Sequence, residues 1–354
     1  MLLGLAFSSC QKGSTMSWKK LPPSGPEGFS IDVILLTGPG EGFAASKQTD
    51  FDKLLADKDW KKREAEDPAY ISRVQDNWKV VEPVLETTGI FAGLYRTGSG
   101  GVLALNRTYG AADGQKGLAR FYGFEGGAWS EISRLEQDAI MVLGSDSPWL
   151  LAMGYSGRPD IPYSAFSQNG GRSWHIIENL GVDFLQGIRN SPLWLDSLGR
   201  LYHPFRTYLG RRQLSDSLAQ PTWEKIQNFP DSFQPLLIVG AEQALHVLGR
   251  KGPGEFTLWS WTLEGREKGR EKIVSCRGLP EGFIPRHLSL GKAGMHLVGT
   301  VEQKAKGETT GLKYFMYRST NEGSSWVNLD LPITGSLKSY DFGEDGAILS
   351  LIHI

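Results

Sequence analysis

Two eight-residue segments share one pattern, and this pattern constrains the fold more than any other feature of the sequence. Residues 167–174 and 319–326 both read Ser-x-Asn-x-Gly-x-Ser-Trp, where x varies. The Asn side chain and the Ser hydroxyls can bond backbone groups within a tight turn, and Gly takes a φ that other residues resist. The Trp then leads the next strand, where its indole suits a gap between neighbouring sheets. The two segments therefore predict one structural turn that is used twice.

The pattern resembles the Asp-box, or bacterial neuraminidase repeat, in which the third position is usually Asp. Here Asn takes that position in both copies. In the Asp-box family this turn joins the third strand of a β-propeller blade to the fourth. The resemblance implies structural roles, rather than ligand contacts, for ten residues: Ser167, Asn169, Gly171, Ser173, Trp174, Ser319, Asn321, Gly323, Ser325 and Trp326.

Weaker copies of the same order recur along the chain, each with an apolar strand, a polar turn, a Trp and a short strand. The spacing is about 50 residues, which suits one four-stranded blade. A second turn signal recurs within each period, between the first two strands, as at residues 196–202 and 291–297. We therefore expect an all-β fold, a seven-bladed β-propeller of four-stranded antiparallel blades, with six blades as the alternative. The outer strands are marked by Trp18, Trp78, Trp129, Trp174, Trp223 and Trp326, with Ile273 in the place of a seventh Trp.

The two ends of the chain determine how the ring closes. Residues 338–343 and 347–354 read as two strands, and residues 18–21 supply an outer strand for the same blade. If residues 2–7 also form a strand, the last blade closes from two N-terminal and two C-terminal strands; otherwise it has three strands. We expect residues 11–354 to form a single propeller domain. The stretch 49–68 is rich in charge and helix formers, which predicts a helical insertion that is either a solvated helix or a lid.

Cys10 follows a short apolar run that ends in small residues. Residues 1–10 look like the end of a bacterial lipoprotein signal peptide, although the basic segment that such a signal needs is missing. This interpretation predicts lipidation of Cys10 and a place in the bacterial cell envelope, in the periplasm or on the surface. The alternative is that residues 2–8 form a genuine strand.

Charge and composition exclude several kinds of partner. The chain has 38 Lys plus Arg and 39 Asp plus Glu, a net charge of −1, so no global field favours nucleic acid. Two cysteines and scattered histidines give no metal site, and no glycine-rich phosphate loop is present, so we expect no cofactor. The expected partner is a glycan or protein ligand. We expect a monomer that meets a membrane only through the lipid anchor.

Propellers that resemble this chain include enzymes and non-enzymes: sialidases, xyloglucan-type endoglucanases, sortilin-like receptors and proteins similar to photosystem II assembly factors. The sialidase signature Phe/Tyr-Arg-Ile-Pro is absent, so no catalytic residue is assigned. We expect a non-catalytic binding or scaffold module. The alternative is a sialidase-like or other glycoside hydrolase with a diverged site.

Four arginines are candidates for an anion site. Arg96, Arg189 and Arg286 lie in or beside expected innermost strands, and Arg206 follows the strand at 201–205. Arginines that converge on the central channel can clamp a carboxylate. The alternative is that they pair with acidic residues or solvate the channel mouth. Surface aromatics such as Trp149, Trp194, Trp259 and Trp261 either stack on sugar rings or, more simply, pack between blades.

Overall fold

The structure is a computed structural model of the whole chain. It describes residues 2–6, 19–20, 30–38, 41–47, 66–75, 80–108, 117–144, 147–155, 162–177, 180, 193–215, 222–241, 243–263, 269–291, 294–305, 308–330, 336–342 and 348–353. Cys10, Arg189, Trp18, Trp78 and most of the expected helical insertion lie outside these residues. Pro68, at the end of that stretch, begins a strand.

The described part of the chain is almost entirely antiparallel β-sheet, with one short 3-10 turn at Gly98–Gly100. Six sheets each use four strands that follow one another along the chain. The first three are β3 (Ser30–Gly38), β4 (Glu41–Lys47), β5 (Pro68–Gln75), β6 (Val80–Thr88); β7 (Ile90–Arg96), β8 (Val102–Thr108), β9 (Leu118–Glu125), β10 (Ala128–Leu135); and β11 (Asp138–Gly144), β12 (Leu150–Tyr155), β13 (Pro162–Ser167), β14 (His175–Ile177). The next three are β15 (Trp194–Leu195), β16 (Arg200–Pro204), β17 (Tyr208–Gln213), β18 (Glu224–Asn228); β19 (Gln234–Ala241), β20 (Ala244–Gly252), β21 (Glu255–Thr262), β22 (Glu271–Ser275); and β23 (Ile284–Gly291), β24 (Gly294–Ala305), β25 (Glu308–Ser319), β26 (Val327–Asn328).

The two ends of the chain share one further four-stranded sheet. It combines β2 (Lys19–Lys20), β1 (Leu2–Ala6), β28 (Ile348–His353) and β27 (Ser336–Phe342), in that order. In its register Leu5 lies opposite Ser350. Among the described residues six four-stranded blades are continuous in sequence, which matches the six-blade alternative and differs from the main expectation of seven. The composite sheet is a further four-stranded sheet, built from the two ends of the chain. The composite sheet has the two-plus-two arrangement expected if residues 2–7 include a strand.

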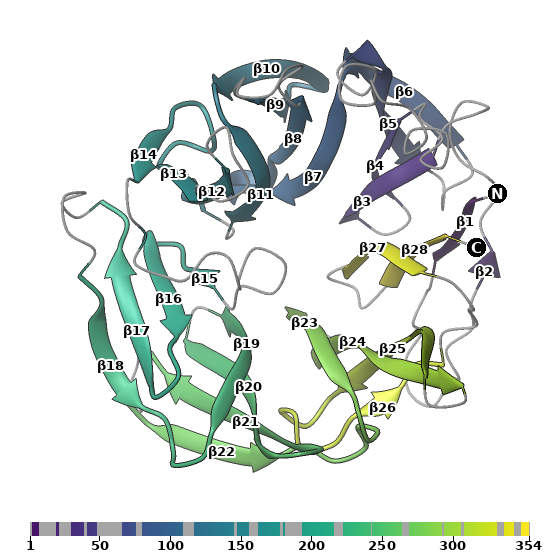
Figure 1. Cartoon of the computed structure of the whole chain (residues 1–354). Helices are drawn as coiled ribbons and strands as arrows, with labels where there is room; N and C mark the ends of the chain where they lie inside the picture. The colour runs from purple at the N-terminus through teal and green to yellow at the C-terminus, as the bar shows by residue number, and fades with distance from the viewer. Residues whose placement is uncertain are drawn as a thin grey trace.

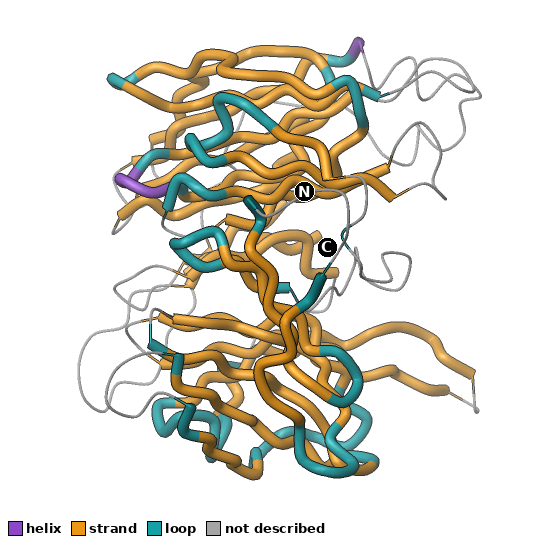
Figure 2. The backbone as a smooth tube through the Cα atoms, turned by 90° about the vertical axis from the view of Figure 1, so that its left-hand side faces the viewer, coloured by secondary structure: helices purple, strands orange, loops and turns teal. Residues whose placement is uncertain are grey.

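The sheets form a closed ring with the first strand of each blade innermost (Figure 1). Contacts run around the whole ring: β3 meets β7 and β27, while β11 meets β7 and β15, β19 meets β15 and β23, and β25 meets β27. Figure 2 shows the ring from the side, with the two ends of the chain close together. Because the ring is closed, the innermost edge strands are protected from pairing with another chain.

The hydrophobic core lies between neighbouring blades rather than within one of them. Strands such as β8 are apolar on both faces, because each blade packs against a neighbour on either side. One core cluster combines Phe43 and Ile71 of the β3–β6 blade with Phe91 and Trp129 of the next blade. The rings of Phe43 and Trp129 meet edge to face, with centroids 5.2 Å apart.

The aromatic marks of the repeat lie where the outer strands begin. Trp129 is in β10, and Trp174, Trp223 and Trp326 immediately precede β14, β18 and β26. Ile273 lies in β22 as expected, but it is 45% exposed and does not fill the interblade gap. The larger ring of Trp259, directly opposite Ile273 on the same face, is fully buried and takes that role.

A second repeated corner joins the outer strand of one blade to the inner strand of the next. This corner was not predicted from the sequence. The amide of Phe233 donates to the carbonyl of Pro230 over 3.1 Å, and that of Phe283 donates to Pro280 over 3.3 Å. The Phe233 ring lies over Gly249, where a Cβ would come within 2.4 Å of its Cζ. The signal was a Pro-acidic-x-Phe string repeated one blade apart.

Candidate functional site

The first Asp-box-like turn links β13 to β14 through a network of side-chain bonds. The Ser167 hydroxyl accepts from the amides of Asn169 (3.3 Å) and Gly171 (2.9 Å), and donates to Asn169 Oδ1 (2.9 Å). Asn169 Oδ1 also accepts from the Ser173 amide at 2.9 Å, and its Nδ2 donates to Ser173 Oγ at 2.9 Å. Gly171 has a φ of 89°, in the left-handed region.

The second turn, between β25 and β26, repeats these five bonds with nearly the same lengths. Ser319 Oγ accepts from Asn321 (3.4 Å) and Gly323 (2.9 Å), and donates to Asn321 Oδ1 (2.9 Å). Asn321 binds the Ser325 amide at 3.0 Å and the Ser325 hydroxyl at 2.9 Å. The side chains of both turns are therefore engaged in holding the turn itself.

Each turn is also attached to the preceding blade. Trp174 Nε1 donates to Ser133 Oγ of β10 at 3.0 Å, and its ring lies 4.4 Å from that of Phe121. In the second turn the amide of Trp326 donates to the carbonyl of Arg277 at 2.9 Å, just beyond β22. These contacts are structural, in the sense that the resemblance implied.

Three of the four arginines proposed from the sequence lie among the described residues. Arg96 ends β7 and reaches sideways, so that its Nε and Nη2 donate to the carbonyl of Leu36 in the neighbouring blade (3.1 and 2.5 Å). Arg286 lies early in β23 and donates to Thr300 Oγ1 of its own blade at 3.4 Å. Arg206 is exposed in the turn between β16 and β17. Arg96 and Arg286 thus each bind an oxygen atom of a nearby strand, and Arg206 lies on a turn. Because Arg189 lies outside the described residues, the expected convergence of the four arginines stays a prediction.

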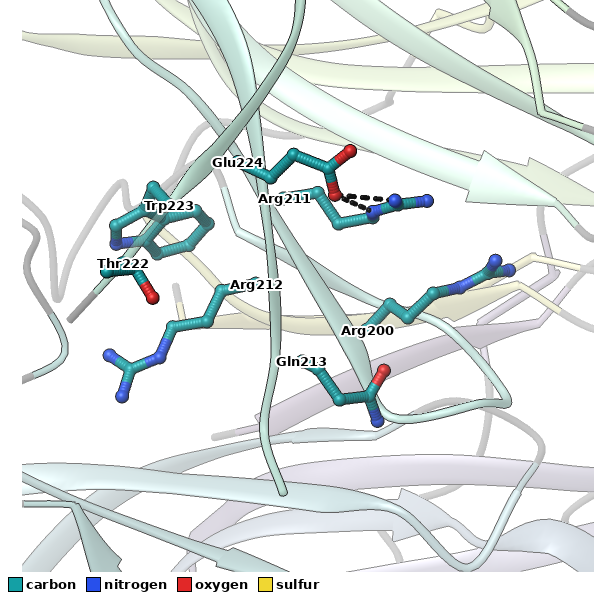
Figure 3. A pocket seen from close by; sticks show the side chains of 7 residues that line it. All are labelled: Arg200, Arg211, Arg212, Gln213, Thr222, Trp223 and Glu224. Carbon is teal, nitrogen blue, oxygen red and sulfur yellow. Dashed lines mark hydrogen bonds and ion pairs between the residues drawn. The ribbon is translucent and has the colours of Figure 1, made fainter. Parts of the chain in front are cut away.

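A different set of arginines lines one cavity. A cavity of about 500 Å³ on the β15–β18 blade, here called the arginine pocket, is lined by side chains from β16, β17 and the start of β18 (Figure 3). The strand register explains the grouping, because Arg200 lies opposite Gln213, and Arg211 lies opposite Glu224. The lining residues are Arg200, Arg211, Arg212, Gln213, Thr222, Trp223 and Glu224.

Arg211 and Arg200 each form an ion pair beside this pocket. Arg211 donates to Glu224 Oε2 through Nε (3.1 Å) and Nη2 (2.5 Å). Arg200 Nε lies 2.5 Å from Asp196 Oδ2. Arg212 is almost fully buried, and its Nη1 donates to the carbonyl of Leu180 at 3.3 Å. The residues that line the pocket thus include three arginines and one carboxylate, Glu224.

Tyr202 lies beneath the pocket and opposite Arg211 in the sheet. It is fully buried, and its hydroxyl donates to Asp196 Oδ2 over 3.4 Å. Burial, with a further contribution from the negative charge of Asp196, raises the pKa of Tyr202 to about 12. The phenol is therefore neutral near pH 7, the opposite of an activated nucleophile.

Trp223 was predicted only to mark the position of an outer strand. Arg200, Arg211 and Arg212 were not among the arginines proposed from the sequence. Trp223 does make a structural contact, since its Nε1 donates to the Leu180 carbonyl at 3.0 Å. It also lines the arginine pocket, so it serves both the blade and the site. The only sequence signal for the pocket was the basic pair Arg211-Arg212 within one strand.

A second cavity, of about 680 Å³, lies at the other end of the same blade. It is lined by Arg206 and Thr207 of the β16–β17 turn, by Asn228 at the end of β18, and by the link to β19 that includes Asp231 and Gln234. This distal cavity contains one basic and one acidic side chain among neutral polar and apolar ones, and the apolar ones are Phe229, Pro230 and Phe233.

The described residues contain no group of three His, Cys, Asp or Glu side chains placed to hold a metal ion. Among the helical residues that the structure describes, none belongs to a helix long and apolar enough to cross a membrane.

No protein-family model matches the chain, and no curated protein matches it in sequence. Its structure is similar to an uncharacterized protein from Listeria monocytogenes EGD-e, with 10% identity, a TM-score of 0.51, and coverage of 85% of this chain and 82% of that chain. It is similar to a prolyl endopeptidase at 11% identity and a TM-score of 0.52, over 90% of this chain but 45% of that one. Human WBSCR16 matches at 10% identity and a TM-score of 0.50, over 99% of both chains. At these identities the similarities show a shared β-propeller fold alone.

Proposed function

We propose that this chain is a non-catalytic binding propeller whose arginine pocket holds an anionic group of a glycan or protein ligand. The observation that carries the proposal is the presence of Arg200, Arg211 and Arg212 around one cavity that is also lined by a Trp. Guanidinium groups match carboxylate, sulfate or phosphate oxygens in a planar, two-pronged geometry. A lining with three arginines and one carboxylate favours such a ligand over a neutral one.

The geometry of the pocket favours binding over catalysis. Glycoside hydrolysis requires two carboxyl groups that act on the scissile bond. Here Glu224 is bound by Arg211 and Asp196 by Arg200. The neighbouring phenol of Tyr202 is buried and neutral, as its raised pKa indicates. These contacts support a site that holds an anion without cleaving its carrier.

The two turns support a further assignment, to the Asp-box propellers, because both reproduce the same Ser–Asn–Ser bonding network within a third-to-fourth strand link. The proposed location is the bacterial cell envelope, with Cys10 as the lipid attachment site. In that case residues 2–6, which form β1, are lost on processing. Mass spectrometry of the membrane fraction tests this location: an acylated N-terminal Cys10 is expected, and an intact Met1 contradicts it.

A binding panel tests the proposed function. Polygalacturonate and poly-glutamate represent acidic glycans and acidic proteins, and dextran serves as a neutral comparison. Arg211→Gln is expected to weaken binding of the acidic polymer by about tenfold, the loss of one charge-assisted bond. Arg172→Gln is the matched control, because Arg172 forms a similar exposed ion pair with Glu125 on another blade.

Two results contradict the proposed function. One is the absence of measurable binding of any acidic polymer at low salt. The other is robust turnover of fluorogenic sialosides or of a mixed polysaccharide panel, which indicates a hydrolase.

A further inference from the structure

The arginine pocket and the distal cavity lie at opposite ends of one outer strand. Glu224, the first residue of β18, lines the arginine pocket, and Asn228, the last residue, lines the distal cavity. Four steps along a strand span about 13 Å. The two cavities therefore flank a surface that is longer than the anionic group the arginine pocket can hold.

Partly exposed aromatic rings connect the two cavities along the same blade. The Trp223 ring, in the arginine pocket, meets Phe205 edge to face with centroids 5.3 Å apart. Phe205 in turn stacks on Tyr208, 4.7 Å away, and Tyr208 lies opposite Asn228 in the sheet. The turn that carries Phe205 and Tyr208 also carries Arg206 into the distal cavity. Trp223, Phe205 and Tyr208, here called the aromatic strip, thus run from one cavity to the other.

The backbone beneath the aromatic strip is adapted to it. A Cβ on Gly210 would lie 2.6 Å from Phe205 Cε2 and 3.2 Å from Trp223 Cε3, so the glycine allows both rings to lie against the strand. Lys225 Nζ lies 5.9 Å from the centre of the Tyr208 ring, which places a further cation beside the strip. The strip therefore combines flat apolar surface with positive charge.

We propose that an extended acidic glycan binds along this blade, with one acidic sugar in the arginine pocket, the chain against the aromatic strip, and a later unit in the distal cavity. This inference rests on the proposed function and specifies its ligand class. A glycan is favoured over an acidic peptide because its sugar rings offer apolar faces to aromatic side chains, in addition to carboxylates for the arginines. The neutral polar side chains that line part of the distal cavity, such as Thr207, Asn228 and Gln234, suit sugar hydroxyls.

The length of the ligand provides the test. Galacturonic acid and oligogalacturonates of increasing length are titrated into the wild-type protein, Arg206→Gln and Tyr208→Ala, with Arg172→Gln as control. We expect affinity to rise with chain length in the wild type. Arg206→Gln and Tyr208→Ala are expected to lower the affinity for the long oligomers by about three- to tenfold and to leave the affinity for the monomer unchanged. Arg211→Gln is expected to lower the affinity for both the monomer and the oligomers.

Three outcomes separate this inference from the proposed function. If affinity is equal at every oligomer length and Arg206→Gln has no effect, the inference of an extended glycan is wrong. Binding that still depends on Arg211 would then leave the arginine pocket as the proposed binding site. Length dependence for oligo-glutamate but not for oligogalacturonate also overturns it, in favour of an acidic protein segment. Loss of all acidic binding overturns both.

Discussion

Ser133 and Trp174 belong to different blades, and a hydrogen bond of 3.0 Å from the Trp174 Nε1 to the Ser133 hydroxyl joins them. The same hydroxyl donates to the carbonyl of Gly171 inside the Asp-box-like turn. One small side chain thus completes two bonds across a blade boundary. The turn therefore attaches neighbouring blades to each other and also reverses the chain.

Ser133→Ala is expected to reduce the free energy of unfolding by about 1–3 kcal/mol, because it leaves a partly buried indole N–H and a carbonyl without their partner. Urea denaturation measures the change. Ser130→Ala, at an exposed position of the same strand, is the control and should change stability by less than about 0.5 kcal/mol. Equal effects of the two substitutions would show that the interblade bond contributes nothing.

Asn169 tests whether the turn is a true equivalent of the Asp-box. In Asn169→Asp the carboxylate still accepts from the Ser173 amide, and the rotatable Ser173 hydroxyl can donate in place of accepting. Stability should therefore change by less than about 0.5 kcal/mol, whereas Asn169→Ala should cost about 1–3 kcal/mol. The melting temperatures of the two variants provide the comparison, and an Asp variant as unstable as the Ala variant contradicts the equivalence.

Gly323 and Gly254 separate backbone strain from packing. Both have a left-handed φ, 81° and 74°. A Cβ on Gly323 would lie 2.6 Å from Cδ2 of the fully buried Leu258, whereas a Cβ on Gly254 would meet open space. Gly254→Ala should cost about 1 kcal/mol from φ alone, and Gly323→Ala should cost about 1–3 kcal/mol more. Chemical denaturation of both variants measures this difference, and similar losses would mean that Leu258 does not constrain the turn.

His296 predicts an acid-sensitive step in stability. It is buried in β24, and burial, with a smaller contribution from Arg318, lowers its pKa to about 4. The unfolded chain takes up the proton near pH 6.5, so stability falls as the pH drops from about 6.5 toward 4. Between pH 7 and pH 5 this group should account for about 2 kcal/mol of the loss.

His296→Gln should flatten this part of the stability profile, as measured by urea denaturation at each pH. His175→Gln, at an exposed position, should not. A profile that is unchanged in His296→Gln would assign the acid sensitivity to other groups.

The turn networks were accessible from the sequence because each is local, with every partner within four residues of Ser167 or Asn169. The Trp marks were accessible for the same reason, through their spacing. The role of Ile273 was predicted wrongly. Ile273 and Trp259 form a cross-strand pair, and the sequence does not show which of the two fills the gap between blades. That choice is decided by packing against another blade.

The arginine pocket could not be predicted from the sequence for a related reason. Arg96 was correctly placed on an inner strand, but its side chain is drawn to the Leu36 carbonyl, 60 residues away in sequence. The actual convergence of Arg200 with Arg211 depends on the register of β16 and β17. Register between strands was not resolved by the repeat pattern, so the composition of the pocket could not follow from it.

Chemical footprinting of the arginines tests the central claim most directly, because it locates the ligand as well as detecting it. The protein is treated with phenylglyoxal with and without polygalacturonate, and modification is mapped by mass spectrometry. We predict strong protection of Arg211 by the ligand and none of Arg172, which forms a similar ion pair and is more exposed (53% against 33%). Equal protection of both arginines, or protection of Arg172 alone, would contradict the arginine pocket as the binding site.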